Sequence, residues 1–124
     1  MTRNQTVEIN HLTVLQIQYL TELEQLEKGR GIIGAVAAKC GVKHPTVSRF
    51  FKSCIEKGYL TESLEFTDKG KKMLRWHQKV QKDVREYLER SGITEGIDDV
   101  LKGMIENIDY RRLEELTKSH MRIN

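Results

Sequence analysis

The sequence contains one proline, two cysteines and few aromatic residues, and it has no long apolar run. Pro45 is the single proline among 124 residues, and aromatic side chains make up 6% of the chain. No Gly/Ser-rich stretch marks a linker between domains. Nowhere do 18 apolar residues follow one another, and the opening MTRNQTVEINH lacks the apolar core of a signal peptide. We therefore expect a cytoplasmic protein without a membrane partner.

The few cysteines exclude a disulfide framework, and the histidines form no ligand pattern. Cys40 and Cys54 have no second cysteine pair near them, as a zinc site would require. The sequence also lacks a Gly-rich phosphate loop, a nucleophile flanked by a base, and a carboxylate pair suited to a cleft. We therefore predict that the protein is not an enzyme and that it needs no cofactor. The scattered histidines are His11, His44, His77 and His120.

Residues 33–52, IGAVAAKCGVKHPTVSRFFK, have the pattern of a helix-turn-helix. Ala37 is small where the second helix must come close, and Gly41 suits a helix end with positive φ. Pro45 fits the first turn of the second helix, which is expected over 45–56, because the missing N–H has no partner there. The residues expected to face inward are Val36, Cys40, Val42, Val47 and Phe50.

Positive charge is concentrated in the middle of the chain. Residues 1–42 carry four basic and four acidic side chains, residues 43–82 carry ten and four, and residues 83–124 carry seven and ten. The middle segment, with a net charge of +6 (ten minus four), begins at the second helix of the motif, where a DNA-binding surface is expected. The alternative for the lysines beyond Arg75 is an ordinary solvated helix face.

The segments around the motif complete a winged domain. A helix with an apolar stripe is expected from Asn10 or Thr13 to Lys28. Residues 59–67, YLTESLEFT, alternate as two very short strands would, and this hairpin would be the wing. Thr67 is expected to cap a long helix that ends at Gly92.

The long helix carries more apolar surface than the small winged domain can cover, and the tail supplies two further helices. They are expected to begin at Thr94 or Asp98/Asp99 and at Asp109. We predict a mostly α fold: a winged helix-turn-helix domain with a minimal β-wing over 1–72, followed by a helical dimerisation domain over 73–124. The alternative is that the tail helices pack back on one monomer. The predicted dimerisation residues are Trp76, Val80, Val84, Leu88, Leu101, Met104 and Ile108.

In a motif of this type, the side chains that reach bases lie at the start and along the outer face of the second helix. Arg49 is the main candidate for base recognition, because a guanidinium can donate two parallel hydrogen bonds to guanine. Thr46 and Ser48 suit phosphates or bases, whereas Lys43 and Lys52 suit the DNA backbone. The predicted DNA-binding residues are Lys43, His44, Pro45, Thr46, Ser48, Arg49, Lys52, Lys69 and Lys71.

Between Leu12 and Leu116 the order of elements resembles the DtxR/MntR family of metal-responsive winged-helix repressors. The strings that carry the resemblance are VAAKCGVKHPTVSRFFKSCIEKGYL at 36–60, LEFTDKGKKM at 64–73 and YLERSGI at 87–93. The first two are shared with other winged-helix regulators, including MarR-like ones. The resemblance implies a homodimeric repressor that binds a pseudo-palindromic double-stranded DNA operator.

The metal ligands that the resemblance implies are largely lost. An ungapped placement puts the family's ligand positions on Thr13, Gln16, Gln81, Lys102, Ile105 and Glu106. Of these only Glu106 suits a cation, and Lys102 would oppose one. We therefore expect a regulator without a bound metal. The alternative is a rearranged site for a divalent transition metal, built from His11, His77 and Glu106. A third hypothesis, of another class, is a protein-interaction module that kept the winged fold and lost DNA binding.

Overall fold

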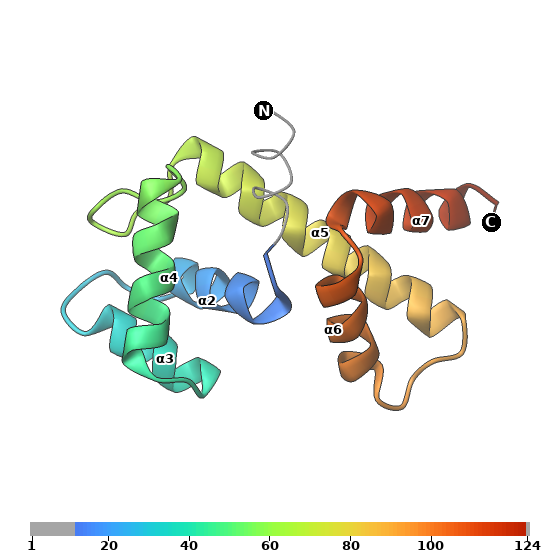
Figure 1. Ribbon diagram of the computed structural model, residues 1–124, viewed down its shortest axis with the longest axis horizontal. Helices are drawn as coiled ribbons and strands as arrows, with labels where there is room; N and C mark the ends of the chain where they lie inside the picture. The colour runs from blue at the N-terminus through green and yellow to red at the C-terminus, as the bar shows by residue number, and fades with distance from the viewer. Residues whose placement is uncertain (1–11, 124) are drawn as a thin grey trace. The chain divides into compact units, whose positions relative to one another are not determined.

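Helices form most of the chain. The computed structural model describes residues 12–123, and side chains as far as residue 118. Within these residues there are six helices and no strand, which confirms the mostly α fold (Figure 1). The helices are α2 (Val14–Gln25), α3 (Ile32–Cys40), α4 (His44–Glu56), α5 (Asp68–Arg90), α6 (Ile97–Asn107) and α7 (Tyr110–Ile123).

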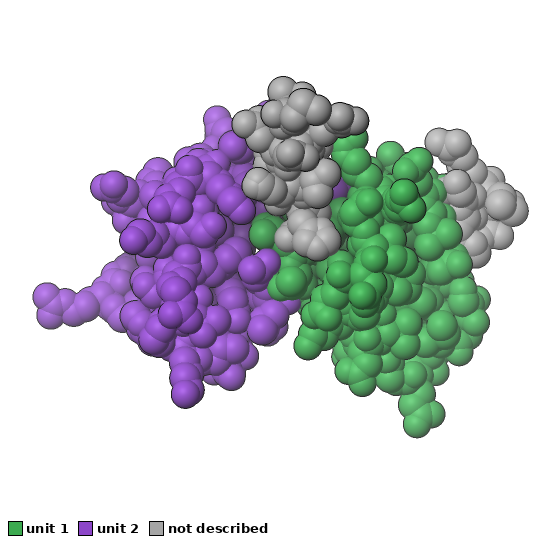
Figure 2. Space-filling view, viewed as in Figure 1, with its two compact units in different colours: residues 1–14, 77–124 green, residues 15–76 purple. Residues whose placement is uncertain are grey.

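The chain divides into two compact units (Figure 2). Unit 2 is Leu15–Trp76, and unit 1 is Met1–Val14 together with His77–Asn124. Helix α5 is continuous and contributes its first turns to unit 2 and the remainder to unit 1. The predicted domain division after residue 72 falls inside this helix.

Unit 2 contains the helix-turn-helix, and its core is formed by apolar side chains from its four helices and from the wing region at residues 59 and 60. α3 and α4 have nearly the predicted bounds, whereas α2 ends at Gln25 and not at Lys28. Residues 27–31 are exposed and include two glycines, so no buried apolar stripe sustains the helix there. The core side chains are Ile17, Tyr19, Leu20, Leu23, Val36, Ala37, Val47, Phe51, Cys54, Tyr59, Leu60, Met73 and Leu74.

The wing (residues 59–67) is a tight loop closed by a single antiparallel bridge between Leu60 and Phe66. The two predicted strands do not form there. The bridge leaves only residues 61–65 to reverse the direction of the chain, and these residues form a turn. Within the turn, Thr61 N donates to Glu65 O at 2.8 Å, and Leu64 N donates to Thr61 O at 2.9 Å. Leu64 has a φ of 63°, a left-handed conformation that interrupts any strand ladder.

Unit 1 packs the second part of α5 with α6 and α7. Tyr110, at the start of α7, is fully buried, and its ring centroid lies 4.3 Å from that of His77 on α5. Asp109 caps α7 as predicted, since its Oδ1 accepts from Arg112 N at 3.0 Å. Helix α6, in contrast to α7, has no side-chain cap. The residue before it is Gly96, with a φ of 70°, and no side-chain hydrogen bond is made at its start. Thr94 is therefore not the first residue of this helix.

Within residues 12–123 we find no helix with the length and apolar composition that crossing a membrane requires.

Candidate nucleic-acid interface

The turn between α3 and α4 is set by the backbone of Gly41. Its φ is 69°, its N–H donates to Ala38 O at 3.3 Å, and Val42 N donates to Ala37 O at 3.0 Å. This pair of bonds is a Schellman motif, which satisfies the last carbonyls of α3 and turns the chain toward α4. Ala37 is buried, as the close approach of the two helices requires. The predicted helix-turn-helix is confirmed.

Helix α4 has one buried face and one exposed face. Val47, Phe51 and Cys54, at spacings of four and three, are buried in the core of unit 2. Phe50 is half-buried, with its ring centroid 5.7 Å from that of Tyr19. The opposite face, which carries Arg49, is therefore turned to solvent.

The structure brings most of the predicted DNA-binding residues onto this exposed face. Ser48 is half-buried, and the others at the start and along the face of α4 are exposed, namely Lys43, His44, Pro45, Thr46, Arg49 and Lys52. The Lys43 side chain forms no hydrogen bond that caps the helix. Pro45 has no N–H, and Thr46 N donates to Lys43 O at 3.1 Å, so neither position offers a free N–H to an anion.

The cations on this face have no acidic partner within the described residues. Lys43, Arg49 and Lys52 form no ion pair there, whereas Lys39 lies 3.9 Å from Glu22. The positive charge of an exposed cation that has no counter-charge within the protein is available to attract an anionic ligand. The outward face of α4 is thus the part of the helix-turn-helix whose positive charges are not neutralised by nearby carboxylates.

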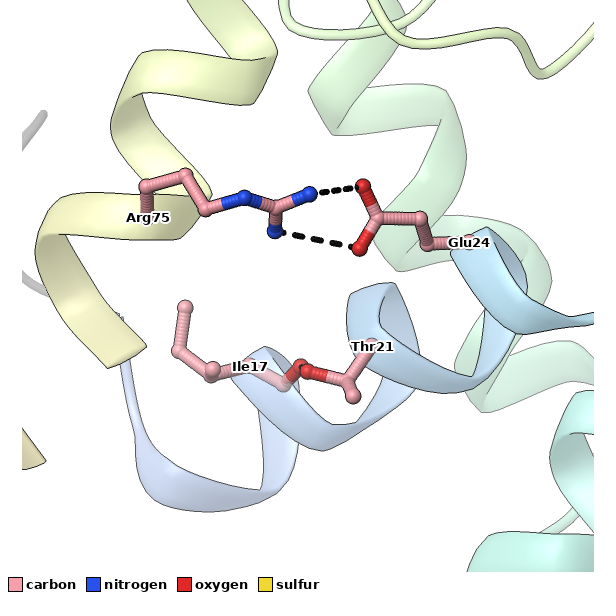
Figure 3. A network of polar contacts seen from close by, with 4 residues as sticks. All are labelled: Ile17, Thr21, Glu24 and Arg75. Carbon is pink, nitrogen blue, oxygen red and sulfur yellow. Dashed lines mark hydrogen bonds and ion pairs between the residues drawn. The ribbon is translucent and has the colours of Figure 1, made fainter. Parts of the chain in front are cut away.

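Arg75, which contributes to the sequence's basic middle segment, is engaged inside unit 2. Its two terminal nitrogens donate to the two carboxylate oxygens of Glu24, one of them at 3.0 Å, and so connect α5 with α2 (Figure 3). On α2, Thr21 Oγ1 donates to Ile17 O at 2.8 Å. The hydrogen bond with Glu24 raises the pKa of Arg75 above its usual value. The guanidinium is therefore a structural group of unit 2.

The start of α5 is bonded to the end of α4. Thr67 Oγ1 accepts from Gly70 N at 3.0 Å, which confirms Thr67 as the cap, and it donates to Gly58 O at 2.6 Å. Lys69 Nζ donates to Lys57 O at 2.9 Å. Both Lys69 and Lys71 are exposed, but only Lys69 is bonded to the segment after α4 in this way.

The wing carries acidic side chains toward solvent. Glu62 and Glu65 are exposed, and residues 60–67 contain no lysine or arginine. Lys28, from the loop after α2, donates to the carbonyl oxygen of Leu64. Because phosphates repel carboxylates, this wing is poorly suited to contact the DNA backbone.

Tyr59, at the base of the wing, has a buried hydroxyl that finds no hydrogen-bond partner within residues 12–123. Burial raises the pKa of Tyr59, and the neighbouring Cys54 adds to the effect. A buried polar group without a partner costs stability because it has lost its bonds to water.

Replacing Tyr59 with phenylalanine is therefore expected to raise the free energy of unfolding by about 1 kcal/mol. Tyr110→Phe is the matched control, since the Tyr110 hydroxyl accepts from Gln81 Nε2 at 2.9 Å, and its removal is expected to lower the same quantity by about 1 kcal/mol. Urea denaturation measures both. Equal losses for the two variants would contradict the prediction.

Comparison with protein families identifies the winged region. The model of the family described as wHTH-PRTase associated matches residues 20–94, which is more than half of the 124-residue chain. The chain belongs to this family. The matched residues contain α3, α4, the wing and α5, so they include every predicted DNA-binding residue of this family member. Comparisons with curated proteins and with solved structures gave no match, and the resemblance to DtxR/MntR proteins is not confirmed.

The predicted dimerisation residues of this wHTH family member fall into two groups. Trp76, Met104 and Ile108 are half-buried. The other four have at most 5% of their surface exposed in a single chain, and they are Val80, Val84, Leu88 and Leu101. These four are core residues of unit 1, so a partner chain would reach them only if the unit opened.

The candidate metal ligands lie in dissimilar surroundings. His77 is buried, Glu106 is exposed on α6, and His11 lies outside the described residues. Among the positions implied by the resemblance, Ile105 is buried and the Gln81 amide bonds to Tyr110. Within the part of the chain that is described, no three His, Cys, Asp or Glu side chains gather as a metal site requires.

The two cysteines differ in exposure. Cys54 is buried, and burial raises the pKa of its thiol to about 12, so the thiol is protonated at neutral pH. Cys40, for which the sequence predicts a core position, is only half-buried at the end of α3. Burial and the nearby Glu22 raise the pKa of the Cys40 thiol.

Sequence reasoning missed two residues that connect the elements of unit 2. Gly70 is one, because the backbone of Tyr59 lies where a side chain would begin. Glu24 is the other, through its ion pair with Arg75. The glycine in the string TDKGKK was a usable signal, since glycine inside a helix is costly unless close packing requires it. No local pattern connects Glu24 with Arg75, which are 51 residues apart.

Proposed function

We propose that the protein is a sequence-specific DNA-binding transcriptional regulator, a repressor that binds a pseudo-palindromic operator as a homodimer and without a metal. One observation carries the proposal: the exposed face of α4 presents Lys43, Arg49 and Lys52 without an acidic partner among the described residues. The second helix of a helix-turn-helix enters the major groove with such a face.

The experiment that tests this is a selection of bound duplexes from a random library with the full chain. We expect an enriched sequence with two related half-sites, about 10 base pairs or a multiple of that apart. The measured quantity is the ratio of the affinity for the selected duplex to the affinity for unrelated duplex. A ratio near one at moderate salt would contradict the regulator and favour the interaction module.

The homodimer is supported by apolar side chains that unit 1 leaves at its surface. Val100 on α6 has 38% of its surface exposed, and Leu116 on α7 has 39%. Met104, one turn from Val100, is half-buried. Association with a second copy in a symmetric pair would bury such exposed apolar side chains.

Replacing Val100 with glutamate is accordingly expected to shift the protein from dimer to monomer at micromolar concentration, because two charges would be buried in the symmetric contact. Sedimentation or light scattering gives the mass. Lys102→Glu, on the opposite side of α6, is the control and is expected to stay dimeric. A wild-type chain that is strictly monomeric would contradict the homodimer itself.

Independence from metal is the third part of the proposal. Its support is the difference in burial between two candidate ligands, since His77 is buried in the core of unit 1 and Glu106 is exposed on α6. Affinity for the selected duplex is expected to be the same with a chelator and with added manganese, iron or zinc. If metal raises the affinity and Glu106→Ala abolishes the rise, the metal-dependent alternative is correct.

The description of the matched family favours a second candidate function, in which the protein acts in association with a PRTase. The protein-interaction hypothesis would then have a defined partner class. Size-exclusion chromatography of the chain mixed with a PRTase from the same cell tests it, and the acidic wing residues Glu62 and Glu65 are the surface to replace first.

A further inference from the structure

We propose that Lys69 does not contact phosphate and instead acts as a positioning residue that holds the C-terminal end of the recognition helix α4. The inference deepens the proposed function and rests on α4 being the DNA-binding helix. It also reverses the expectation, drawn from the basic string at 69–72, that Lys69 contributes to the DNA surface.

The ammonium of Lys69 is held by two groups from the segment after α4. Its Nζ donates to the carbonyl oxygen of Lys57 at 2.9 Å, and it lies 5.3 Å from the centroid of the Tyr59 ring. Lys57 directly follows the last residue of α4, so its carbonyl belongs to the helix end. A cation at that end complements the partial negative charge of the helix terminus, and the ring face attracts it further.

Two residues near Lys69, the cap Thr67 and Gly70 on α5, contact the same segment. Thr67 Oγ1 donates to Gly58 O at 2.6 Å, and Thr67 N donates to Tyr59 O at 3.1 Å. Gly70 admits the Tyr59 carbonyl so closely that a Cβ at this position would lie 2.0 Å from its oxygen. The contacts from Thr67, Lys69 and Gly70 therefore fix residues 57–59, and with them the end of α4.

The position of this helix end matters for DNA recognition. A recognition helix distinguishes bases only if its side chains keep one orientation in the groove, and a loose helix end lowers the affinity for the right sequence more than for a random one. A phosphate contact behaves differently, since it strengthens binding to all sequences and adds to the salt dependence. The two roles can be separated by experiment.

The test compares Lys69→Gln with Lys71→Gln, the same substitution two residues further along α5. Both lysines are exposed and neither forms an ion pair within the described residues, so they differ in the bond that Lys69 makes to Lys57. For the selected duplex and an unrelated one, the affinity is measured from low to moderate salt. Lys69→Gln is expected to lower the ratio of specific to non-specific affinity by about fivefold and to leave the salt slope unchanged. Lys71→Gln is expected to flatten the slope by about 0.9 and to leave the ratio unchanged.

A flatter slope with an unchanged ratio for Lys69→Gln would overturn the inference. If the wild-type chain binds no DNA, the proposed function fails, and a spectroscopic measurement still decides the role of Lys69. Lys69→Gln must then shift the ring-proton resonances of Tyr59 and speed exchange of its amide, which donates to Cys54 O at 2.9 Å. The inference is also overturned if Lys69→Gln changes these signals no more than Lys71→Gln does.

Discussion

Replacing Gly70 with alanine is expected to lower the free energy of unfolding by about 3 kcal/mol. A Cβ at this position would lie 2.0 Å from the carbonyl oxygen of Tyr59, 2.8 Å from its carbonyl carbon and 3.1 Å from its Cα. All three are backbone atoms, so no side chain can rotate away to make room. Either the wing base or the first turn of α5 must move, and the hydrogen bonds of Thr67 to this segment are then lost. Urea denaturation followed by circular dichroism measures the change.

Gly103→Ala is the matched control for this prediction. Gly103 also lies in a helix, α6, but no atom lies within 4 Å of the position that its Cβ would take. Alanine is favoured over glycine in a helix, so this variant is expected to gain about 1 kcal/mol. If Gly70→Ala were as stable as the wild type, the close contact with Tyr59 would not exist in solution.

Replacing Arg49 with alanine is expected to cost about 1–3 kcal/mol of binding free energy for the selected duplex, with relaxed preference at one base position. Arg49 is exposed on α4, opposite the buried Val47 and Phe51, and has no ion pair within residues 12–123. Its planar group can donate two parallel bonds to a guanine edge in a fixed geometry, which the flexible ammonium of a lysine lacks.

Lys52→Ala is the comparison for Arg49→Ala, because Lys52 lies one turn further along the same face. It is expected to weaken binding to all duplexes alike and to flatten the salt slope by about one unit. Quantitative gel shifts with single-base variants of the selected duplex separate the two effects. Equal losses on every duplex for Arg49→Ala would assign it to the DNA backbone and not to a base.

The helix-turn-helix could be predicted from sequence because its determinants are local. Gly41 ends α3 in the conformation that only glycine adopts without strain, and Pro45 falls in the first turn of α4. Thr67 and Asp109 cap their helices through bonds to residues three positions ahead. Each of these signals lies within a few residues of the structure that it specifies, so a single sequence contains it in full.

The wing and the dimerisation surface were predicted less well, because both depend on contacts between distant segments. Alternation over 59–67 indicated two strands, yet the wing has one bridge, and its turn is held by Lys28 from the loop after α2. The periodicity of α5 indicated an apolar face that needed a cover. It could not show that Val80 and Val84 are already buried within a single chain.

The sequence by itself determined the helix-turn-helix, the caps at Thr67 and Asp109 and the face of α4 that points to solvent, because helix periodicity and capping are properties of short segments. Only the tertiary structure decided which cations of the winged domain are engaged internally. Arg75 and Lys69 stand in the same basic stretch as Lys71, but the first bonds to Glu24 and the second to Lys57. Whether a charge is available to a ligand depends on what folds against it, and those partners lie far away in the chain.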